Sequence, residues 1–225
     1  MSEWNSQQGQ IHAIRRRAMV LFGLAAYLAL MAAGYVVLEP GGWALHLWAN
    51  LFWTLSALIG ALQCARTARN CAQAHRRKAW YWFALGCAFW FGGMLIWDWR
   101  ELVQQVYTPF PDYSDFGFDL FVPCFVVGFF YYGTNTKSQE MTLLKIGDLG
   151  VVLCVIIIAS VAVLHDPIEN LQESRLYLIA ALSYPVIHVS ALIFGLIIFW
   201  RHEWGSERTP LALMLVGLAV MTATV

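Results

Sequence analysis

Long apolar runs alternate with short polar stretches along the whole chain. A run of about 20 apolar residues is the length at which an α-helix crosses the hydrocarbon core of a bilayer. The pattern therefore predicts an all-α protein, a polytopic transmembrane helical bundle. We expect seven spans, at about residues 18–38, 43–64, 79–99, 115–132, 146–164, 175–200 and 210–225.

The two ends of the chain differ from the spans between them. Residues 1–17 are polar and predict an N-terminal lead before a bundle at 18–225. The last apolar run follows Pro210, and only fifteen residues of it are present, with no polar tail to close it. We therefore expect the seventh span to be truncated and the full protein to have eight spans.

Composition agrees with a membrane protein. The chain of 225 residues is 60% hydrophobic, with a mean hydropathy of +0.59, and it is 12% charged, whereas soluble domains are about 25% charged. The net charge is zero and no basic stripe suggests nucleic acid as a partner. The cysteines are odd in number and form no CxxC pair, which favours small buried hydrophobes: Cys64, Cys71, Cys87, Cys124 and Cys154.

The basic residues are distributed unevenly over the predicted loops. Of the 14 Lys and Arg residues, 12 lie on the side of the N-terminus, and only Arg100 and Arg175 lie on the other side. Because cytoplasmic loops carry an excess of Lys and Arg, the N-terminus is predicted to be cytoplasmic. Seven spans then leave the chain outside, so a cytoplasmic domain after this chain would require an eighth span.

Four carboxylates gather at the outer ends of the third and fourth spans. Asp98 and Glu101 end the third span, and Asp115 and Asp119 lie four residues apart on one face of the fourth. Such a cluster predicts a site for a divalent cation, a cationic ligand or a proton. The alternative is helix capping and ion pairing, for which the candidates are Arg100, Asp112, Ser114 and Asp115.

Histidines and prolines add further candidates. His46 and His165 fall at the outer face, where carboxylates nearby favour a transition-metal site, and His188 lies in the middle of the sixth span. A lone histidine in a span is more often a hydrogen-bonding residue between helices, and the unequal depths disfavour haem. Pro123 and Pro185 interrupt the fourth and sixth spans and are candidate hinges or ordinary kinks.

Catalytic motifs are absent from the sequence. It contains no Walker loop, no HExxH and no GxSxG, and no lysine follows Pro210 to support a retinal Schiff base. No catalytic residue and no cofactor is therefore expected in this chain. The function classes left open are a sensor, a small-solute or proton transporter, and a metal- or haem-binding redox subunit.

Three pieces of sequence resemble the multi-span N-terminal sensor region of bacterial GGDEF/EAL (cyclic-di-GMP) signalling proteins. The resemblance covers about residues 80–225. The second piece is Ile146-Gly147-Asp148-Leu149-Gly150-Val151, and the third is Ala181-Leu182-Ser183-Tyr184-Pro185. The first piece consists of Trp97, Glu101, Phe110, Pro111, Asp115, Pro123 and Gly128. His188 stands where the family usually has an acid, and the seventh span stops before the family's Ala-Asp step.

This resemblance implies a sensor module in the bacterial cytoplasmic membrane. It implies a diguanylate cyclase or phosphodiesterase domain beyond this chain, and GTP and Mg²⁺ only for that domain. The expected partners are the lipid bilayer, an unknown small ligand or ion, and a second copy in a homodimer, although no stretch of sequence declares an interface. A histidine kinase with the same membrane part is an alternative that this chain does not distinguish.

Overall fold

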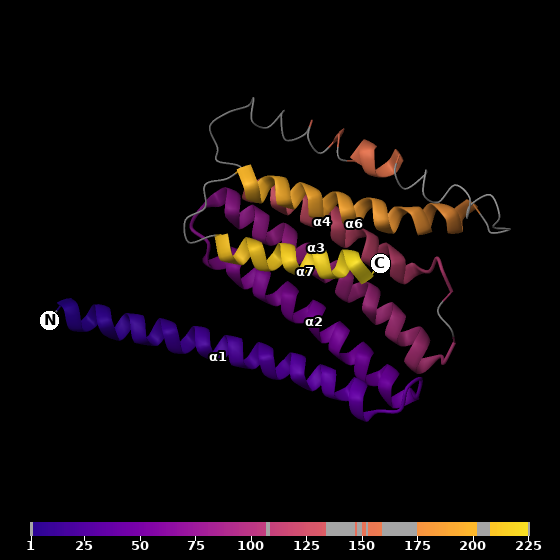
Figure 1. The fold of residues 1–225 in the computed structure, drawn as a ribbon, viewed down its shortest axis with the longest axis horizontal. Helices are drawn as coiled ribbons and strands as arrows, with labels where there is room; N and C mark the ends of the chain where they lie inside the picture. The colour runs from indigo at the N-terminus through magenta and orange to yellow at the C-terminus, as the bar shows by residue number, and fades with distance from the viewer. Residues whose placement is uncertain are drawn as a thin grey trace. The chain divides into compact units, whose positions relative to one another are not determined.

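The computed structural model describes residues 2–106, 109–133, 147, 150–151, 153–158, 175–201 and 208–224. These residues form α-helices and one π-helix (η1), with no strand among them. Figure 1 shows α1 (Ser2–Val37), α2 (Trp43–Asn70), α3 (Ala74–Asp98), η1 (Trp99–Val103), α4 (Tyr113–Tyr132), α6 (Arg175–Arg201) and α7 (Arg208–Thr224). The all-α prediction is therefore confirmed for the described residues.

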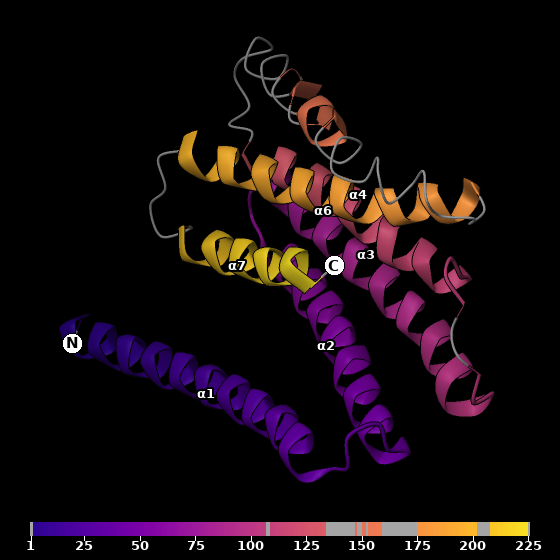
Figure 2. The same ribbon diagram turned by 45° about the vertical axis from the view of Figure 1, so that its right-hand side comes forward.

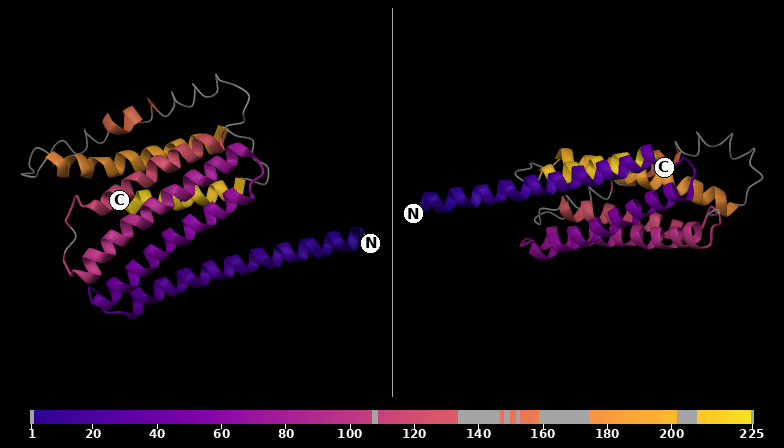
Figure 3. Two further views of the ribbon diagram at one scale, coloured as in Figure 1. Left: turned by 180° about the vertical axis from the view of Figure 1, so that it is seen from behind. Right: turned by 90° about the horizontal axis from the view of Figure 1, so that it is seen from below.

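The chain divides into two units, Met1–Trp53 and Thr54–Val225. In the first unit, a short turn joins α1 to the start of α2 (Figure 3), and Gly41 in that turn has a positive φ of 74°. The Tyr27 hydroxyl donates to the Phe52 carbonyl at 2.6 Å. The indole of Trp48 lies so close to Gly34 that a Cβ there would be 2.0 Å from its Nε1, so only glycine fits at this crossing.

In the second unit, α4 lies against both α3 and α6, and α6 lies against α7 (Figure 2). The α3–α4 crossing is close because glycines face each other there. A Cβ on Gly117 would lie 2.7 Å from the Cα of Gly93. Away from this crossing, toward the start of α3 and the end of α4, aromatic rings fill the core. Phe83 contacts Phe125 and Phe129 there, at centroid distances of 5.1 and 5.3 Å.

Five of the described helical segments are long and apolar enough to cross a membrane. They are Ala18–Val37, Trp43–Asn70, Ala74–Val103, Tyr113–Tyr132 and Ser183–Trp200, and a shorter apolar stretch runs over Thr209–Thr222. Many apolar side chains of the five segments are exposed, such as Phe22 at 77% and Phe116 at 68%, as expected where lipid replaces water as the solvent. The structure therefore supports a membrane protein with five spans in its described part.

The seven predicted spans differ from this result at two places. Most of the predicted fifth span, 146–164, lies outside the described residues, although residues 153–158 are helical. The predicted seventh span corresponds to α7, which has 17 residues and is too short to count as a span. A count of seven or eight spans is thus not shown by the structure.

Helix boundaries also differ from the sequence prediction. The polar lead at 1–17 continues the first helix, because α1 already begins at Ser2. The third span does not end at Trp99, since η1 extends it to Val103 and the Gln104 amide donates to the Trp99 carbonyl at 3.0 Å. Pro123 and Pro185 lie inside α4 and α6, as predicted. Their role as hinges remains a prediction.

Candidate functional site

The first turn of α4 is built from acidic residues with assigned partners. Asp112 is its N-cap residue, and the Asp112 backbone N–H donates to Asp115 Oδ2 at 2.6 Å, which is one half of a capping box. Arg100 Nη2 forms an ion pair with Asp112 Oδ1 at 2.8 Å, and the Asp112 side chain is only 4% exposed. Capping by Asp112 and Asp115 and pairing by Arg100 were the sequence alternative to a ligand site, and both are present, whereas the Ser114 hydroxyl, the third capping candidate, has no hydrogen-bond partner among the described residues.

Asp115 also joins α4 to α6. The Tyr184 hydroxyl donates to Asp115 Oδ1 at 2.5 Å, so both carboxylate oxygens of Asp115 accept a hydrogen bond. Phe110, in the loop before α4, lies beside the Tyr184 ring at a centroid distance of 6.0 Å. The Tyr184–Asp115 hydrogen bond therefore lies beside the Phe110 ring, where the first turn of α4 contacts α6.

Asp119 lies one turn further along α4, and its carboxylate has fewer hydrogen-bond partners than that of Asp115. Ser183 Oγ is 3.2 Å from Asp119 Oδ2 and 2.7 Å from the Ala180 carbonyl. A serine hydroxyl has one hydrogen to donate, and the shorter distance favours the carbonyl. Asp119 Oδ1 is buried and has no hydrogen-bond partner among the described residues. Asp119 is thus a carboxyl group in a spanning helix with spare capacity to bind a proton or a donor.

His188 occupies the next turn of α6. Its side chain is fully buried, and its ring stacks on Tyr184 at a centroid distance of 5.9 Å. Nδ1 lies 2.9 Å from the Tyr184 carbonyl, and because a carbonyl only accepts, Nδ1 must carry the hydrogen. In the neutral ring, Nε2 is then an acceptor, and it has no partner within the described part of the chain.

Asp98, the last residue of α3, and Glu101, in η1, have different partners. Thr54 Oγ1 donates to Asp98 Oδ2 at 2.6 Å, which links α2 to α3. Trp97 Nε1 donates to Glu101 Oε2 at 2.7 Å, within the same helical stretch. The four carboxylates predicted as one cluster are therefore held as two pairs, one bonded to Thr54 and Trp97 and the other bonded to α6.

The predicted metal site receives no support from the described residues. His46 is exposed on α2 in the first unit, and His165 lies outside the described residues. Where the structure describes the chain, no group of three or more His, Cys, Asp or Glu side chains could hold a metal ion. A metal or haem group remains an untested alternative from the sequence.

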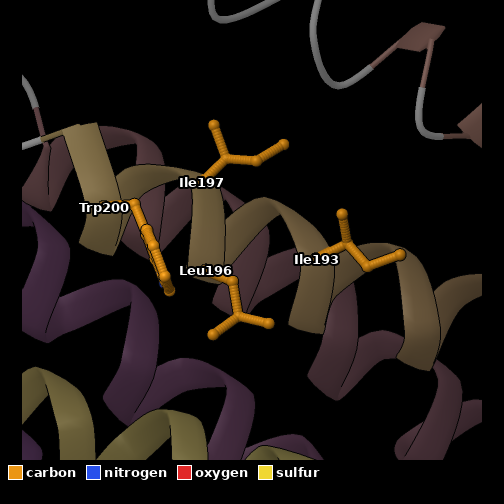
Figure 4. A pocket seen from close by; sticks show the side chains of 4 residues that line it. All are labelled: Ile193, Leu196, Ile197 and Trp200. Carbon is orange, nitrogen blue, oxygen red and sulfur yellow. The ribbon is translucent and has the colours of Figure 1, made fainter.

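A hollow of about 300 Å³ lies on the surface of α6, away from the polar residues. Figure 4 shows the described side chains that line it, Ile193, Leu196, Ile197 and Trp200, all from this one helix. Its apolar lining suits a lipid acyl chain rather than a polar ligand. The hollow therefore does not mark the candidate site, which is the polar contact between α4 and α6.

Sequence reasoning missed two partners of these acids. Thr54 and Ser183 are hydroxyl residues inside apolar runs that also contain other hydroxyl residues, and nothing in the sequence assigns Thr54 to Asp98 or Ser183 to Asp119. The available signal is that a carboxylate inside a span needs a donor from a neighbouring helix. That rule identifies the kind of partner but not the residue.

The chain was compared with protein families, curated proteins and solved structures. No family profile, no curated protein and no solved structure matches it.

Proposed function

We propose that this chain is the membrane sensor module of a bacterial signalling protein, relaying a signal to a cytoplasmic diguanylate cyclase or phosphodiesterase domain. In this proposal the module belongs to the cytoplasmic membrane and its N-terminus is cytoplasmic. Seven spans precede an eighth that leads into the output domain, and GTP and Mg²⁺ bind only in that domain. The positive-inside distribution of Lys and Arg supports the orientation.

One observation carries the proposal: two separate pieces of the sequence resemblance meet in space. Asp115 belongs to the first piece and Tyr184 to the third, and their side chains are hydrogen-bonded at 2.5 Å. Within the first piece, Trp97 and Glu101 are also bonded to each other. Short apolar motifs easily match by chance. A chance match, however, gives no reason for polar residues of different motifs to be hydrogen-bonded to each other.

The α4–α6 contact supplies an element that a signal can bias. Asp115 and Asp119 on α4 face Tyr184 and Ser183 on α6, and Pro185 directly follows Tyr184. Polar bonds within a span can be exchanged for bonds to a ligand, an ion or a proton. A signal shifts the equilibrium only if it binds one arrangement of these bonds more tightly than the other. The expected signal is therefore one that competes for the Asp115 or Asp119 carboxyl group.

The proposal is tested on the native gene product in its own membranes. Its intact mass is expected to exceed the 25.4 kDa of this chain and to include a GGDEF, EAL or kinase domain. A kinase domain would support the sensor assignment and replace the cyclic-di-GMP output. A mass equal to that of this chain would remove the output domain from the proposal.

The site is then tested by substitution in the same full-length protein. Tyr184→Phe and Asp115→Ala are expected to change cellular cyclic-di-GMP in the same direction, because each removes the Tyr184–Asp115 bond. Tyr113→Phe is the matched control, since Tyr113 lies on the same helix as Asp115 and is 70% exposed. Equal cyclic-di-GMP levels in all variants, at equal amounts of protein in the membrane, would exclude this contact from signalling.

A proton or small-solute transporter is the second candidate. It is favoured by buried atoms on Asp119 and His188 that have no hydrogen-bond partner among the described residues and are able to take a proton inside a span. It predicts that proteoliposomes with this chain dissipate a pH gradient and that Asp119→Asn stops the dissipation. Proteoliposomes that hold the gradient as well as empty liposomes would remove this candidate.

A further inference from the structure

The α4–α6 contact holds two carboxylates without a matching positive charge. Asp115 and Asp119 lie one helical turn apart in the span Tyr113–Tyr132, and like charges at this spacing repel each other. Among the described side chains neither acid has an ion-pair partner, and Arg100 forms its ion pair with Asp112 instead. Charge inside a span is costly unless it is paired. The contact therefore favours a bound cation.

The same contact has hydrogen-bond acceptors left over. Asp119 Oδ1 and His188 Nε2 are buried atoms with no hydrogen-bond partner in the described part of the chain. His188 is fully buried, its Nδ1 lies 2.9 Å from the Tyr184 carbonyl, and its ring is parallel to the Tyr184 ring within 4°. Because Nδ1 carries the hydrogen in this arrangement, Nε2 of the neutral ring can only accept. Both spare atoms therefore suit a ligand that donates hydrogen bonds.

Aromatic rings lie at the end of this contact that is near the loop before α4. Phe110 in that loop packs against Tyr177 and Tyr184 of α6, at centroid distances of 5.2 and 6.0 Å. Phe110 is 39% exposed, so this end of the aromatic set is accessible. The face of an aromatic ring attracts a cation, and sets of such rings are used to recognise organic ammonium groups. The rings and the unpaired acids therefore favour the same charge on a ligand.

These features distinguish between three kinds of cation. A metal ion would need several ligands at once, and the described residues contain no group of three or more His, Cys, Asp or Glu side chains that could hold one. A proton on Asp119 would supply a single donor and would gain little from the rings. A primary ammonium group supplies three donors and a positive charge that aromatic faces attract. The contact is therefore best matched by a protonated primary amine.

We propose that the α4–α6 contact binds a primary alkylammonium ion, whose N–H groups donate to Asp119 Oδ1 and His188 Nε2. Its carbon chain lies against the rings of Phe110 and Tyr184, and its charge offsets that of the two carboxylates. Because it bonds to both helices, it favours the arrangement in which α4 and α6 are in contact. As the signal of a sensor this ligand rests on the proposed function, whereas its binding is measured independently of that function.

The test measures the binding of three probes to the full chain purified in detergent. The probes are butylammonium chloride, butan-1-ol as its uncharged isostere, and tetramethylammonium chloride as a cation without N–H donors. Affinity is obtained from the rise of the thermal unfolding midpoint with probe concentration, at constant ionic strength. Butylammonium is expected to bind at least about tenfold more tightly than either other probe, the factor for one hydrogen bond to a charged group. An unchanged midpoint with butylammonium, or equal affinity for tetramethylammonium, would overturn the proposal.

Variants separate a built site from general charge attraction. Asp119→Asn and His188→Phe are each expected to weaken butylammonium binding about tenfold, since the first removes the negative charge and the second removes an acceptor. The matched control Glu39→Gln removes the same charge from an exposed position in the turn after α1 and should leave binding unchanged. Equal losses in Asp119→Asn and Glu39→Gln would overturn the site. Where a variant does not fold, the comparison of probes on the unchanged chain decides the proposal.

Binding and signalling are scored separately in the full-length protein. Butylammonium binding without any change in cellular cyclic-di-GMP would support the ligand and contradict the sensor assignment. A change in cyclic-di-GMP caused by Tyr184→Phe, in a protein that does not bind butylammonium, would support the sensor and overturn the ligand.

Discussion

The hydrogen bond between Tyr184 and Asp115 is expected to stabilise the α4–α6 contact measurably. Tyr184→Phe removes a 2.5 Å bond to a carboxylate that is 8% exposed. Hydrogen bonds to charged groups contribute about 1.5–3 kcal/mol in soluble proteins, whereas bonds between transmembrane helices average about 0.6 and reach about 1.7 kcal/mol. Asp115 keeps the bond from the Asp112 amide, so the carboxylate is not left bare. We therefore expect a loss of about 1–1.5 kcal/mol in the free energy of unfolding, near the upper part of the membrane range.

The assay is reversible unfolding in mixed micelles, followed by circular dichroism. Tyr184→Phe, Asp115→Ala and the double variant form a double-mutant cycle, with Tyr113→Phe as the control for loss of an exposed hydroxyl. A coupling energy of about 1 kcal/mol is expected, because both single variants remove the same contact. If the two single effects add within about 0.3 kcal/mol, the residues do not interact and the reasoning about the α4–α6 contact is wrong.

Two further predictions concern α3 and its neighbours. Gly117→Ala should destabilise the chain by about 1–3 kcal/mol in the same unfolding assay, because the new Cβ would lie 2.6–2.7 Å from α3 backbone atoms that have no room to move. Gly92→Ala, with no atom within 4 Å of the new Cβ, should be neutral or stabilising, and equal effects at both positions would contradict the close crossing. Arg100→Gln should cost about 2 kcal/mol by leaving the buried Asp112 carboxylate unpaired, and adding Asp112→Asn should recover part of that loss, since Asn caps a helix as well as Asp does. A double variant that is less stable than Arg100→Gln alone would argue against the ion pair.

The fold class could be predicted because apolar run length alone determines it. A continuous apolar run such as 43–64 can cross a membrane only as a helix, and the structure has the helix α2 there. The boundaries were harder because polar residues can continue a helix. Arg66 and Arg69 extend α2 to Asn70, and the polar lead extends α1 back to Ser2. Hydropathy indicates where the lipid-facing part of a helix ends, whereas the helix itself ends where its backbone hydrogen bonds end.

The candidate site could be predicted only in part, for a physical reason. Positions 115 and 119 share a helix face by spacing alone, so the sequence was enough to pair them. Their partners depend on how α4 and α6 cross, which is set by long-range packing. Gly195 and Gly133 help to set how α4 and α6 pack, because a Cβ at these positions would lie 3.0 Å from Phe129 and 2.7 Å from Ile198, respectively. No spacing rule within one helix contains that information.

The two faces of α4 differ in a way that bears on mechanism. Toward α3, Gly117 meets the backbone of Gly93, and a dry contact of this kind has one close-packed arrangement. Toward α6, Asp115 and Asp119 meet hydroxyl groups, and Asp119 Oδ1 is left without a described partner. A hydroxyl can rotate to another acceptor at small cost, whereas a backbone contact cannot be exchanged. If a signal changes this bundle, the change should therefore separate α6 from α4 and leave α3 and α4 together, and crosslinks across each face would distinguish the two.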